Sequence, residues 1–563
     1  MSPGNAAAVA KASAPDAFVL SRFNPGGWRL VAFGIAALVI APLLVVFSSL
    51  LSPEQEIWAH LAEHVLPELL FNTFWLVLGV GIGTVVLGVS LAWLSAVCEF
   101  PGRRFFSWAM LLPMAMPAYV SAFVFIGLLD FTGPVQTGLR EFFGGSIWFP
   151  RIRSTGGVVA VMSLTLYPYV YLLAKNAFAT QGKQALEAAQ SLGHHRISGF
   201  FRVALPMARP WIAGGMMLAL METLADFGTV SIFNYDTFTT AIYKAWFGLF
   251  SVSAASQLAS LLIVIVFAFL FAEQLSRSRM RFTQPGRHAQ NKDRIVLARG
   301  MAWLASGYCT LVLAVAFLIP VAQLAHWSWQ VFGQELDTRY LDFLWHSLLL
   351  SGIAALLTAA CALLLAYAKR HHRDSWIAAA ARIATLGYAL PGPVLAVGIF
   401  VVIAWLDNLL TTTLKAYFQI ETGLLLQGTL LLMLSAYLIR FLAVGYHPVE
   451  SAMQRLTYSI DEASRSLGVG GMTMLRRVHL PVLRGGLLTG LVLVFMDVMK
   501  EIPITLMTRP FGWDTLAVRI FEMTSEGEWE RAALPAITIV AAGLVPIFLI
   551  TRHADGDPKC SSN

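Results

Sequence analysis

The chain has 563 residues, of which 57% are hydrophobic and only 13% carry a charge. Soluble globular proteins carry a charge on about 25% of their residues, so this composition excludes an ordinary soluble domain and indicates an integral membrane protein. The formal net charge is +7, but the basic residues fall in short intervals between apolar runs. That distribution is typical of membrane-protein loops and does not indicate a nucleic-acid-binding surface.

Apolar runs of the length that crosses a bilayer as a helix, roughly 17–25 residues, recur along the whole chain. In the first half we expect spans near 30–51, 71–96, 106–129, 157–175, 211–232 and 254–274. In the second half we expect them near 299–322, 345–367, 377–405, 425–446, 487–508 and 535–551. The sequence therefore predicts an all-α integral membrane fold with about 12 transmembrane helices, six in each half.

The charges of the intervals between spans predict the orientation of the chain. Arg103 and Arg104 follow the second span, and a basic stretch follows the sixth, whereas the first interval carries Glu63 and Glu68. Because intervals on one side of the membrane alternate along the chain, the positive-inside rule places the basic intervals and both termini in the cytoplasm. We expect a multi-pass membrane protein. The expected parts are a cytoplasmic tail (1–25), a first transmembrane repeat (26–274), a basic linker (275–298), a second repeat (299–552) and a C-terminal tail (553–563).

Two polar intervals carry the same pattern. One runs from Glu187 to Gly193 and is followed by Leu205-Pro206; the other runs from Glu462 to Gly468 and is followed by Leu480-Pro481, each position being 275 residues later. Colinear matches at a constant offset predict a tandem duplication. Helix-forming residues before each glycine and an amphipathic stretch after it predict a helix, a glycine turn and a second helix.

Two acidic pairs are also repeated near the ends of predicted spans. Glu222 and Asp226 are four residues apart and share a helical face, and Asp497 and Glu501 repeat the arrangement. Carboxylates at such positions line a path for a hard cation in one interpretation. In the other, they cap the outer ends of the fifth and eleventh spans, with Lys500 neutralising Glu501. The sequence leaves both open and assigns no metal ligands.

The sequence contains no pattern typical of catalysis. Its four cysteines have no metal-binding spacing, and we expect no disulfide among them: Cys98, Cys309, Cys361 and Cys560. Gly182-Lys183 is followed by Gln184 rather than by the Ser or Thr of a phosphate-binding loop. We therefore assign no catalytic residue and no cofactor to this chain, and we do not expect it to be an enzyme.

The two repeated intervals resemble the EAA coupling loop of permease subunits from ATP-binding-cassette (ABC) importers. The first copy, Glu187-Ala188-Ala189, matches fully, and the second has Ser464 in place of the second Ala. The resemblance implies that a separate ATP-binding subunit, present in two copies, docks on these loops and hydrolyses ATP. It implies coupling roles for Glu187, Ala188, Ala189, Gly193, Leu205, Pro206, Glu462, Ala463, Gly468, Leu480 and Pro481.

The segments around the acidic pairs, 224–230 and 497–503, resemble those of ferric-iron permeases of the fused, two-half type. This resemblance implies an importer of the bacterial inner membrane that takes Fe(III) from a periplasmic binding protein. Permeases for thiamine, polyamines, phosphonates or sulfate share the fold and the coupling loop and remain alternatives. An ion-coupled secondary transporter with internal repeats is a further alternative, although such a transporter does not need paired coupling loops.

Overall fold

The computed structural model describes residues 25–51, 55–145, 148–191, 193, 195–278, 294–371, 374–469 and 471–555. Within these ranges the regular structure is helical apart from one parallel pair of two-residue strands, β1 (Cys98–Glu99) and β2 (Ile295–Val296). Most of the two expected tails and of the linker at 275–298 lies outside the described residues, as does Cys560.

The helices follow one another in the same order in both halves of the chain. The first half contains α1 (Pro25–Ser48), α2 (Gln55–His60), α3 (Leu66–Val97), α4 (Arg103–Ala109), α5 (Ala118–Leu129), α6 (Pro134–Phe143), α7 (Thr155–Ser191), α8 (Arg196–Gly199), α9 (Leu205–Ala225), α10 (Gly228–Ile232), α11 (Phe238–Tyr243) and α12 (Val252–Ser278). The second contains α13 (Arg299–Leu313), α14 (Ile319–Glu335), α15 (Thr338–His371), α16 (Ser375–Ala384), α17 (Gly392–Phe418), α18 (Leu430–Gln454), α19 (Tyr458–Ser466), α20 (Gly471–Met474), α21 (Leu480–Met499), α22 (Pro503–Thr508), α23 (Leu516–Ser525) and α24 (Trp529–Asp555).

Short 3-10 and π segments join some of these helices. The 3-10 segments are η1 (Ser49–Leu51), η3 (Leu112–Ala115) and η7 (Thr385–Ala389). The π segments are η2 (Leu61–Val65), η4 (Phe200–Ala204), η5 (Lys244–Gly248), η6 (Ala314–Leu318) and η8 (Leu475–His479). Among them, η3 corresponds to η7 and η4 to η8, so even the irregular turns of the helices are repeated.

Within the described residues, 11 helical stretches are long and apolar enough to cross a membrane. This confirms the predicted all-α membrane fold. The expected span at 535–551 falls inside α24, which is not one of the eleven.

Four expected spans are interrupted in the structure. The predicted helices at 106–129 and 377–405 are wrong as continuous spans, because Pro117 and Pro391 are the N-caps of α5 and α17. A proline has no N–H to donate to a preceding turn, so a helix begins after it more readily than it passes through it. The predicted helices at 211–232 and 487–508 are likewise divided, between α9 and α10 and between α21 and α22.

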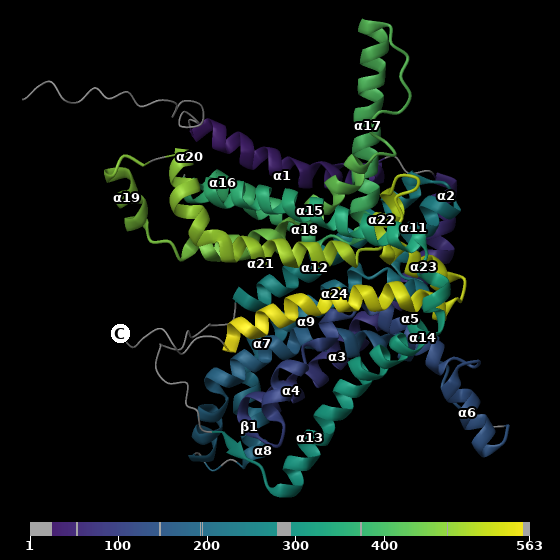
Figure 1. Cartoon of the computed structure of the whole chain (residues 1–563), viewed down its shortest axis with the longest axis vertical. Coiled ribbons are helices and arrows are strands. Elements are labelled where there is room, and N and C mark those ends of the chain that lie inside the picture. Colours follow the sequence, from purple (N-terminus) through teal and green to yellow (C-terminus); the bar gives the residue numbers. More distant parts are fainter. Residues whose placement is uncertain are drawn as a thin grey trace, which may run out of the picture. The chain divides into compact units, whose positions relative to one another are not determined.

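The described chain divides into two compact units that cut across the two sequence repeats. One unit contains Met1–Ile40, Ala355–Gly387 and Phe441–Val494, and the other contains Ala41–Ala354, Tyr388–Arg440 and Phe495–Asn563. In the second unit, which is the larger, α5 of the first half packs against α14 and α24 of the second half (Figure 1). Phe123 and Tyr167 lie in the same buried core there as Trp327. The core of this unit therefore combines both halves of the sequence.

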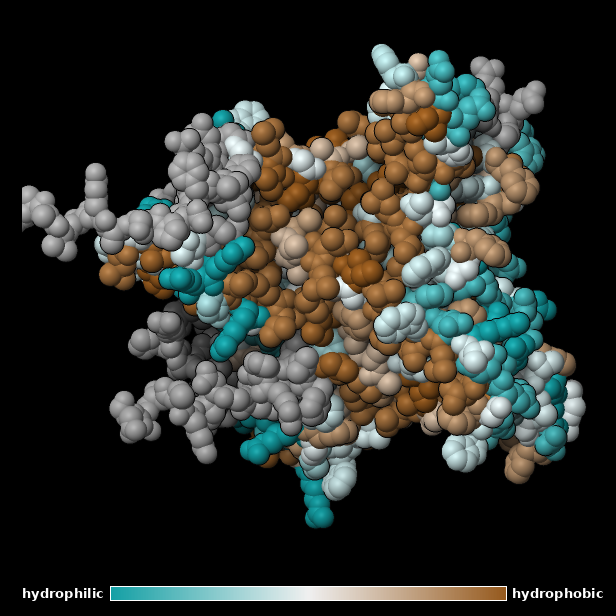
Figure 2. Space-filling model, turned by 45° about the horizontal axis from the view of Figure 1, so that its top comes forward, coloured by the Kyte–Doolittle hydropathy of each residue, from teal (hydrophilic) through white to brown (hydrophobic). Residues whose placement is uncertain are grey.

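One face of α3 is apolar and exposed. Its exposed large side chains recur every three or four residues, at Phe71, Trp75, Leu78, Ile82 and Val86, which is the spacing of a single helical stripe. Hydrophobic side chains also cover much of the face that Figure 2 shows, with hydrophilic ones gathered toward its edges. Such a surface is stable against lipid tails and would be a liability in water.

Close approach of membrane helices depends on repeated small residues. In the larger unit, a Cβ atom on Gly215 of α9 would lie 2.7 Å from the Cα of Val170 in α7. In the smaller unit, Gly490 of α21 holds the same position in the repeat, and its Cβ would lie 2.9 Å from the carbonyl oxygen of Gly445 in α18. Van der Waals packing at such contacts drives helix association in a bilayer, where the hydrophobic effect contributes little.

We predict that Gly215→Ala destabilises the protein by about 1–3 kcal/mol, because the new methyl group meets backbone atoms that have no rotamer through which to escape. Thermal unfolding in detergent measures the change. Gly307→Ala in α13 is the matched control, since a methyl group at that position would have no other atom within 4 Å. An equal melting temperature for the two variants contradicts the assigned contact.

Candidate functional site

The first predicted coupling segment is the end of one long helix. α7 runs for 37 residues and includes Glu187, which is exposed, and Ala189, which is buried. Ala188 lies in the same helix, but its side chain is outside the described residues. Gly193 follows with a φ of +83°, and its N–H donates to the Gln190 carbonyl. This left-handed conformation ends the helix at little cost only for glycine.

The second coupling segment is a separate short helix. Glu462 and Ala463 are exposed on α19. Gly468 has a φ of +77° and donates its N–H to Arg465, while the next N–H, of Val469, bonds to the Ser464 carbonyl. These two bonds form a complete Schellman ending. The predicted helix, glycine turn and second helix are thus confirmed locally in both copies.

The remaining predicted residues of the coupling segments begin the next helices. Leu205 and Pro206 open α9 and are half-buried, whereas Leu480 and Pro481 open α21 and are exposed. Ser464, the departure from the EAA pattern, is buried like Ala189 at the same place in the repeat. Its hydroxyl donates to the Ile460 carbonyl within α19, over 2.7 Å. The serine at this position therefore leaves no buried hydroxyl without a hydrogen-bond partner.

Asp226 and Glu501 each cap the short helix that follows them. The carboxylate of Asp226 accepts the Thr229 hydroxyl at 2.9 Å and the Val230 N–H at 3.2 Å, at the start of α10. The carboxylate of Glu501 accepts the Ile504 N–H at 3.0 Å, at the start of α22. Carboxylates satisfy the free N–H groups of a helix N-terminus and are stabilised by its dipole.

The other two acids have side-chain partners. Glu222 accepts a hydrogen bond from the Tyr388 hydroxyl at 2.8 Å. Lys500 lies 2.8 Å from Asp497. The expectation that Lys500 neutralises Glu501 is corrected by this contact, because the ion pair of Glu501 is made with Arg440 at 3.9 Å.

The four acids interact electrostatically although they come from both repeats. Asp226 and Glu501 lie just beyond the ends of their spans. Burial raises the pKa of the Asp226 carboxyl to about 6, the hydrogen bonds from Thr229 and Val230 oppose this, and the charge of Glu222 adds to it. Burial likewise raises the pKa of Glu501, Arg440 opposes the rise, and Glu222 and Asp497 reinforce it. These residues thus form one cluster, which we call the carboxylate cluster: Glu222, Asp226, Asp497 and Glu501.

The carboxylate cluster does not have the form of a metal cage. In the part of the chain that the structure describes, no three His, Cys, Asp or Glu side chains are grouped so as to hold a metal ion. Each carboxylate instead has a donor or cation from the chain itself.

Sequence reasoning missed Tyr388 and Arg440. Arg440 had a detectable signal, as a lone cation within an apolar stretch. Tyr388 had none, because a tyrosine near a span is common and its partner is 166 residues away in sequence.

Comparison with protein families identifies the class of protein. The model of the family described as "Binding-protein-dependent transport system inner membrane component" matches this chain twice, over residues 84–281 and 358–556. The two matches begin 274 residues apart and end 275 residues apart, and together they cover more than half of the chain. The chain therefore belongs to this family and carries its domain in tandem, which confirms the predicted duplication.

The chain is also similar to individual transport proteins. It is 28% identical over 493 residues to the Fe(3+)-transport system permease protein FbpB 2 of Haemophilus influenzae, covering 86% of this chain and 90% of that protein. It is 22% identical to the ferric transport system permease protein FbpB of Actinobacillus pleuropneumoniae, covering 91% and 75%. Similarity to the sulfate transport system permease protein CysT of Salmonella typhimurium, at 28% identity, extends over only 34% of this chain.

We predict that Arg440→Met destabilises the protein by about 3–5 kcal/mol, because it leaves the buried Glu501 without its cation. The double variant Arg440→Met/Glu501→Gln should regain much of this, since it removes both charges and keeps an oxygen for the Ile504 N–H. Chemical unfolding in detergent measures the free energies of unfolding of the unmodified protein and of both variants.

An exposed ion pair provides the matched control for the buried pair of Arg440 and Glu501. Lys415 and Glu421 form an ion pair with side chains that are 69% and 81% accessible, and such pairs contribute about 0–1 kcal/mol. Lys415→Met should therefore change stability little. Equal losses from Arg440→Met and Lys415→Met contradict the buried ion pair.

Proposed function

We propose that this chain is the membrane-spanning subunit of an ATP-driven importer that moves ferric iron from a periplasmic binding protein to the cytoplasm. The observation that carries the proposal is the double occurrence of the family domain, each copy with an acidic helix end, a left-handed glycine and a Leu-Pro at the same spacing. Paired segments of this kind suit a partner that is itself used twice.

The energy source in this proposal is a separate ATP-binding subunit in two copies. One copy docks on the segment from Glu187 to Pro206, and the other docks on the segment from Glu462 to Pro481. The exposure of Glu187, Glu462 and Ala463 supports such docking, because a soluble partner has access to these side chains. ATP binding draws the two partners together, and the attached helices then reorient the permease between outward and inward access.

The proposed docking of the ATP-binding subunits sets the orientation of the chain in the membrane. With both coupling segments in the cytoplasm, both termini and the linker at 275–298 also lie there. The proposed parts are the first repeat at 26–274 and the second at 299–552, flanked by tails at 1–25 and 553–563. The acidic intervals then face the periplasm, where the binding protein delivers the cargo.

The cargo assignment rests on the relatives and on the carboxylate cluster. Relatives that align with most of this chain carry ferric transport in their names. Glu222 and Asp497 are half-buried, and their present partners are a hydroxyl and an ammonium group. Both partners are exchangeable, so these two carboxylates are suited to interact transiently with a passing cation. Asp226 and Glu501, as helix caps, hold the backbone around this path.

Strain in either glycine turn should uncouple the permease from ATP hydrolysis. We predict that Gly193→Val and Gly468→Val each lower binding-protein-stimulated ATP hydrolysis and uptake about 5- to 30-fold, because a branched side chain at positive φ displaces the docking segment at a cost of about 1–2 kcal/mol. The measurement uses the complex in proteoliposomes.

Gly512→Val controls for backbone strain as such. Gly512 also has a positive φ, +78°, with open space around it, but it lies in the loop between α22 and α23. This variant should couple normally. ATP-independent uptake by the unmodified protein contradicts the proposed function and favours an ion-coupled transporter.

The carboxylates offer a second test. We predict that Glu222→Gln and Asp497→Asn lower Fe(III) uptake about tenfold, as the loss of ~1.4 kcal/mol of attraction for the cation implies, while ATP hydrolysis continues. Asp342→Asn, an exposed acid of α15, is the control. Unchanged iron uptake in both variants removes the proposed path, and competition by sulfate, phosphonate, thiamine or a polyamine reassigns the cargo.

A further inference from the structure

The two coupling segments differ in how they are joined to the preceding membrane helix. α7 runs without interruption from Thr155 to Ser191, so the first segment is a direct extension of a span. In the second repeat, α18 ends at Gln454 and α19 begins only at Tyr458. A continuous helix transmits a displacement through its own hydrogen bonds, whereas a broken one does not.

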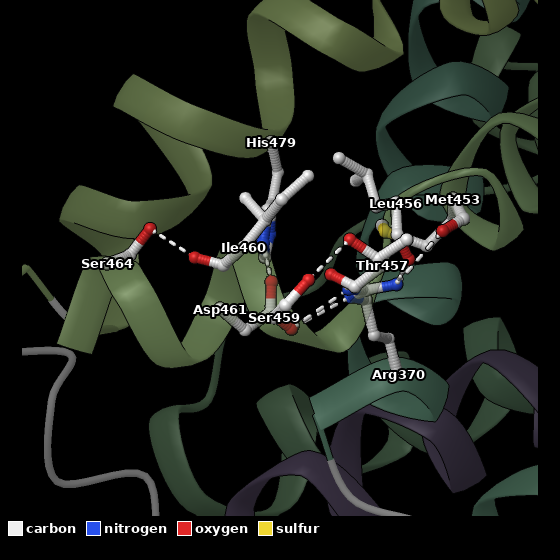
Figure 3. A network of polar contacts seen from close by, with 9 residues as sticks. All are labelled: Arg370, Met453, Leu456, Thr457, Ser459, Ile460, Asp461, Ser464 and His479. Carbon is white, nitrogen blue, oxygen red and sulfur yellow. Dashed lines mark hydrogen bonds and ion pairs between the residues drawn. The ribbon is translucent and has the colours of Figure 1, made fainter. Parts of the chain in front are cut away.

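A single arginine spans the break in the second repeat. Arg370, in the last turn of α15, donates from Nη1 to the carbonyl oxygens of Met453 at 3.0 Å and Leu456 at 2.9 Å. Its Nη2 donates to the Thr457 carbonyl at 3.3 Å. Figure 3 shows these three carbonyl groups gathered around one guanidinium. The Met453 oxygen also accepts the Leu456 N–H, and the Thr457 oxygen also accepts the Ile460 N–H. Arg370 thereby adds side-chain hydrogen bonds to the backbone bonds on both sides of the break.

The same guanidinium pairs with a carboxylate on the far side of the break. Asp461, in the first turn of α19, lies 3.1 Å from Nε and 3.0 Å from Nη2 of Arg370. Its other oxygen is 2.9 Å from Nε2 of His479, which belongs to η8 at the entry to α21. An ionised carboxylate only accepts, so His479 donates this bond. In Figure 3, Asp461 points between Arg370 and His479.

All three side chains are enclosed. The side chains of Arg370, Asp461 and His479 are 7%, 10% and 1% accessible. Enclosure weakens the screening by water that makes exposed ion pairs loose. Two nitrogens of Arg370, Nε and Nη2, meet one oxygen of Asp461, Oδ2, which fixes an orientation as well as a distance. The result is a stiff connection between the end of α15, the end of α18, α19 and the start of α21.

The first repeat contains apolar residues at the corresponding positions. An offset of 275 relates Asp461 to Leu186 and His479 to Ala204. The offset of 274 that holds at the start of the two family matches relates Arg370 to Ala96. The ion network is therefore present where the helix is broken and is replaced by apolar residues where the helix is continuous.

We propose that Arg370, Asp461 and His479 form a positioning network that replaces backbone continuity in the second repeat, and that it carries the displacement of α19 to α15 and α21. This inference rests on the proposed function, since it assumes that an ATPase moves α19. It adds that the two coupling segments are driven by different means, one through a helix and the other through side chains.

The test measures the number of cargo ions taken up per ATP hydrolysed, using the complex with its ATPase in proteoliposomes. In Arg370→Lys the positive charge still pairs with Asp461. A single ammonium group cannot bind all three carbonyl groups in the way that the planar guanidinium does. We expect the complex to assemble and hydrolyse ATP, with uptake per ATP reduced roughly fivefold or more, the lower end of typical coupling between sites. Wild-type uptake per ATP overturns the proposal.

A second variant separates coupling from the burial of charge. The triple variant Arg370→Ala/Asp461→Leu/His479→Ala installs the residues of the first repeat and leaves no unpaired buried charge. It should also hydrolyse ATP with reduced uptake per ATP. If the triple variant couples normally, the network serves only to satisfy buried charges, and the proposal is wrong.

Lys369→Gln is the matched control. Lys369 precedes Arg370 in α15 and pairs with Glu450, which lies in α18 before the break. This pair does not reach α19, so its loss should leave uptake per ATP unchanged. Failure of the proposed function is recognised separately, because the unmodified complex would then show no ATP-dependent uptake at all.

Discussion

The fold of this chain depends on the need to satisfy backbone hydrogen-bonding groups in apolar surroundings. A continuous helix meets this need by itself, and lipid offers no water to replace a missing bond. The helices α5 and α17 begin at a proline without a side-chain cap, but at other breaks a carboxylate accepts the freed N–H groups. Asp226 caps α10, Glu501 caps α22, and the buried Asp407 of α17 accepts the N–H groups of Leu425, Leu426 and Gln427.

This constraint explains why acids sit at the ends of α9 and α21. Dividing a span into a long helix and a short one releases N–H groups, and a carboxylate two residues before the short helix receives them. The structure thus gives Asp226 and Glu501 a capping role. Glu222 and Asp497, one helical turn earlier, have exchangeable side-chain partners instead. The repeated acidic pair combines a residue that caps a helix with one that pairs with another side chain.

The same constraint distinguishes the two coupling segments. Both end in a left-handed glycine, so the two segments end with the same local geometry. The connection to the preceding span differs, because one copy extends a 37-residue helix and the other follows a break that Arg370 bridges. The polar network of Arg370, Asp461 and His479 occurs in the copy whose helix is broken.

The sequence by itself determined the membrane fold, the duplication and the positions of both glycine turns. These features depend on composition, on spacing and on residues close together in the chain, which a single sequence displays directly. The tertiary structure alone decided which partners the acids take. Tyr388 reaches Glu222 across 166 residues, and Arg440 rather than the adjacent Lys500 pairs with Glu501. Such pairings depend on how distant helices pack, because packing brings together groups whose separation in sequence carries no signal of their contact.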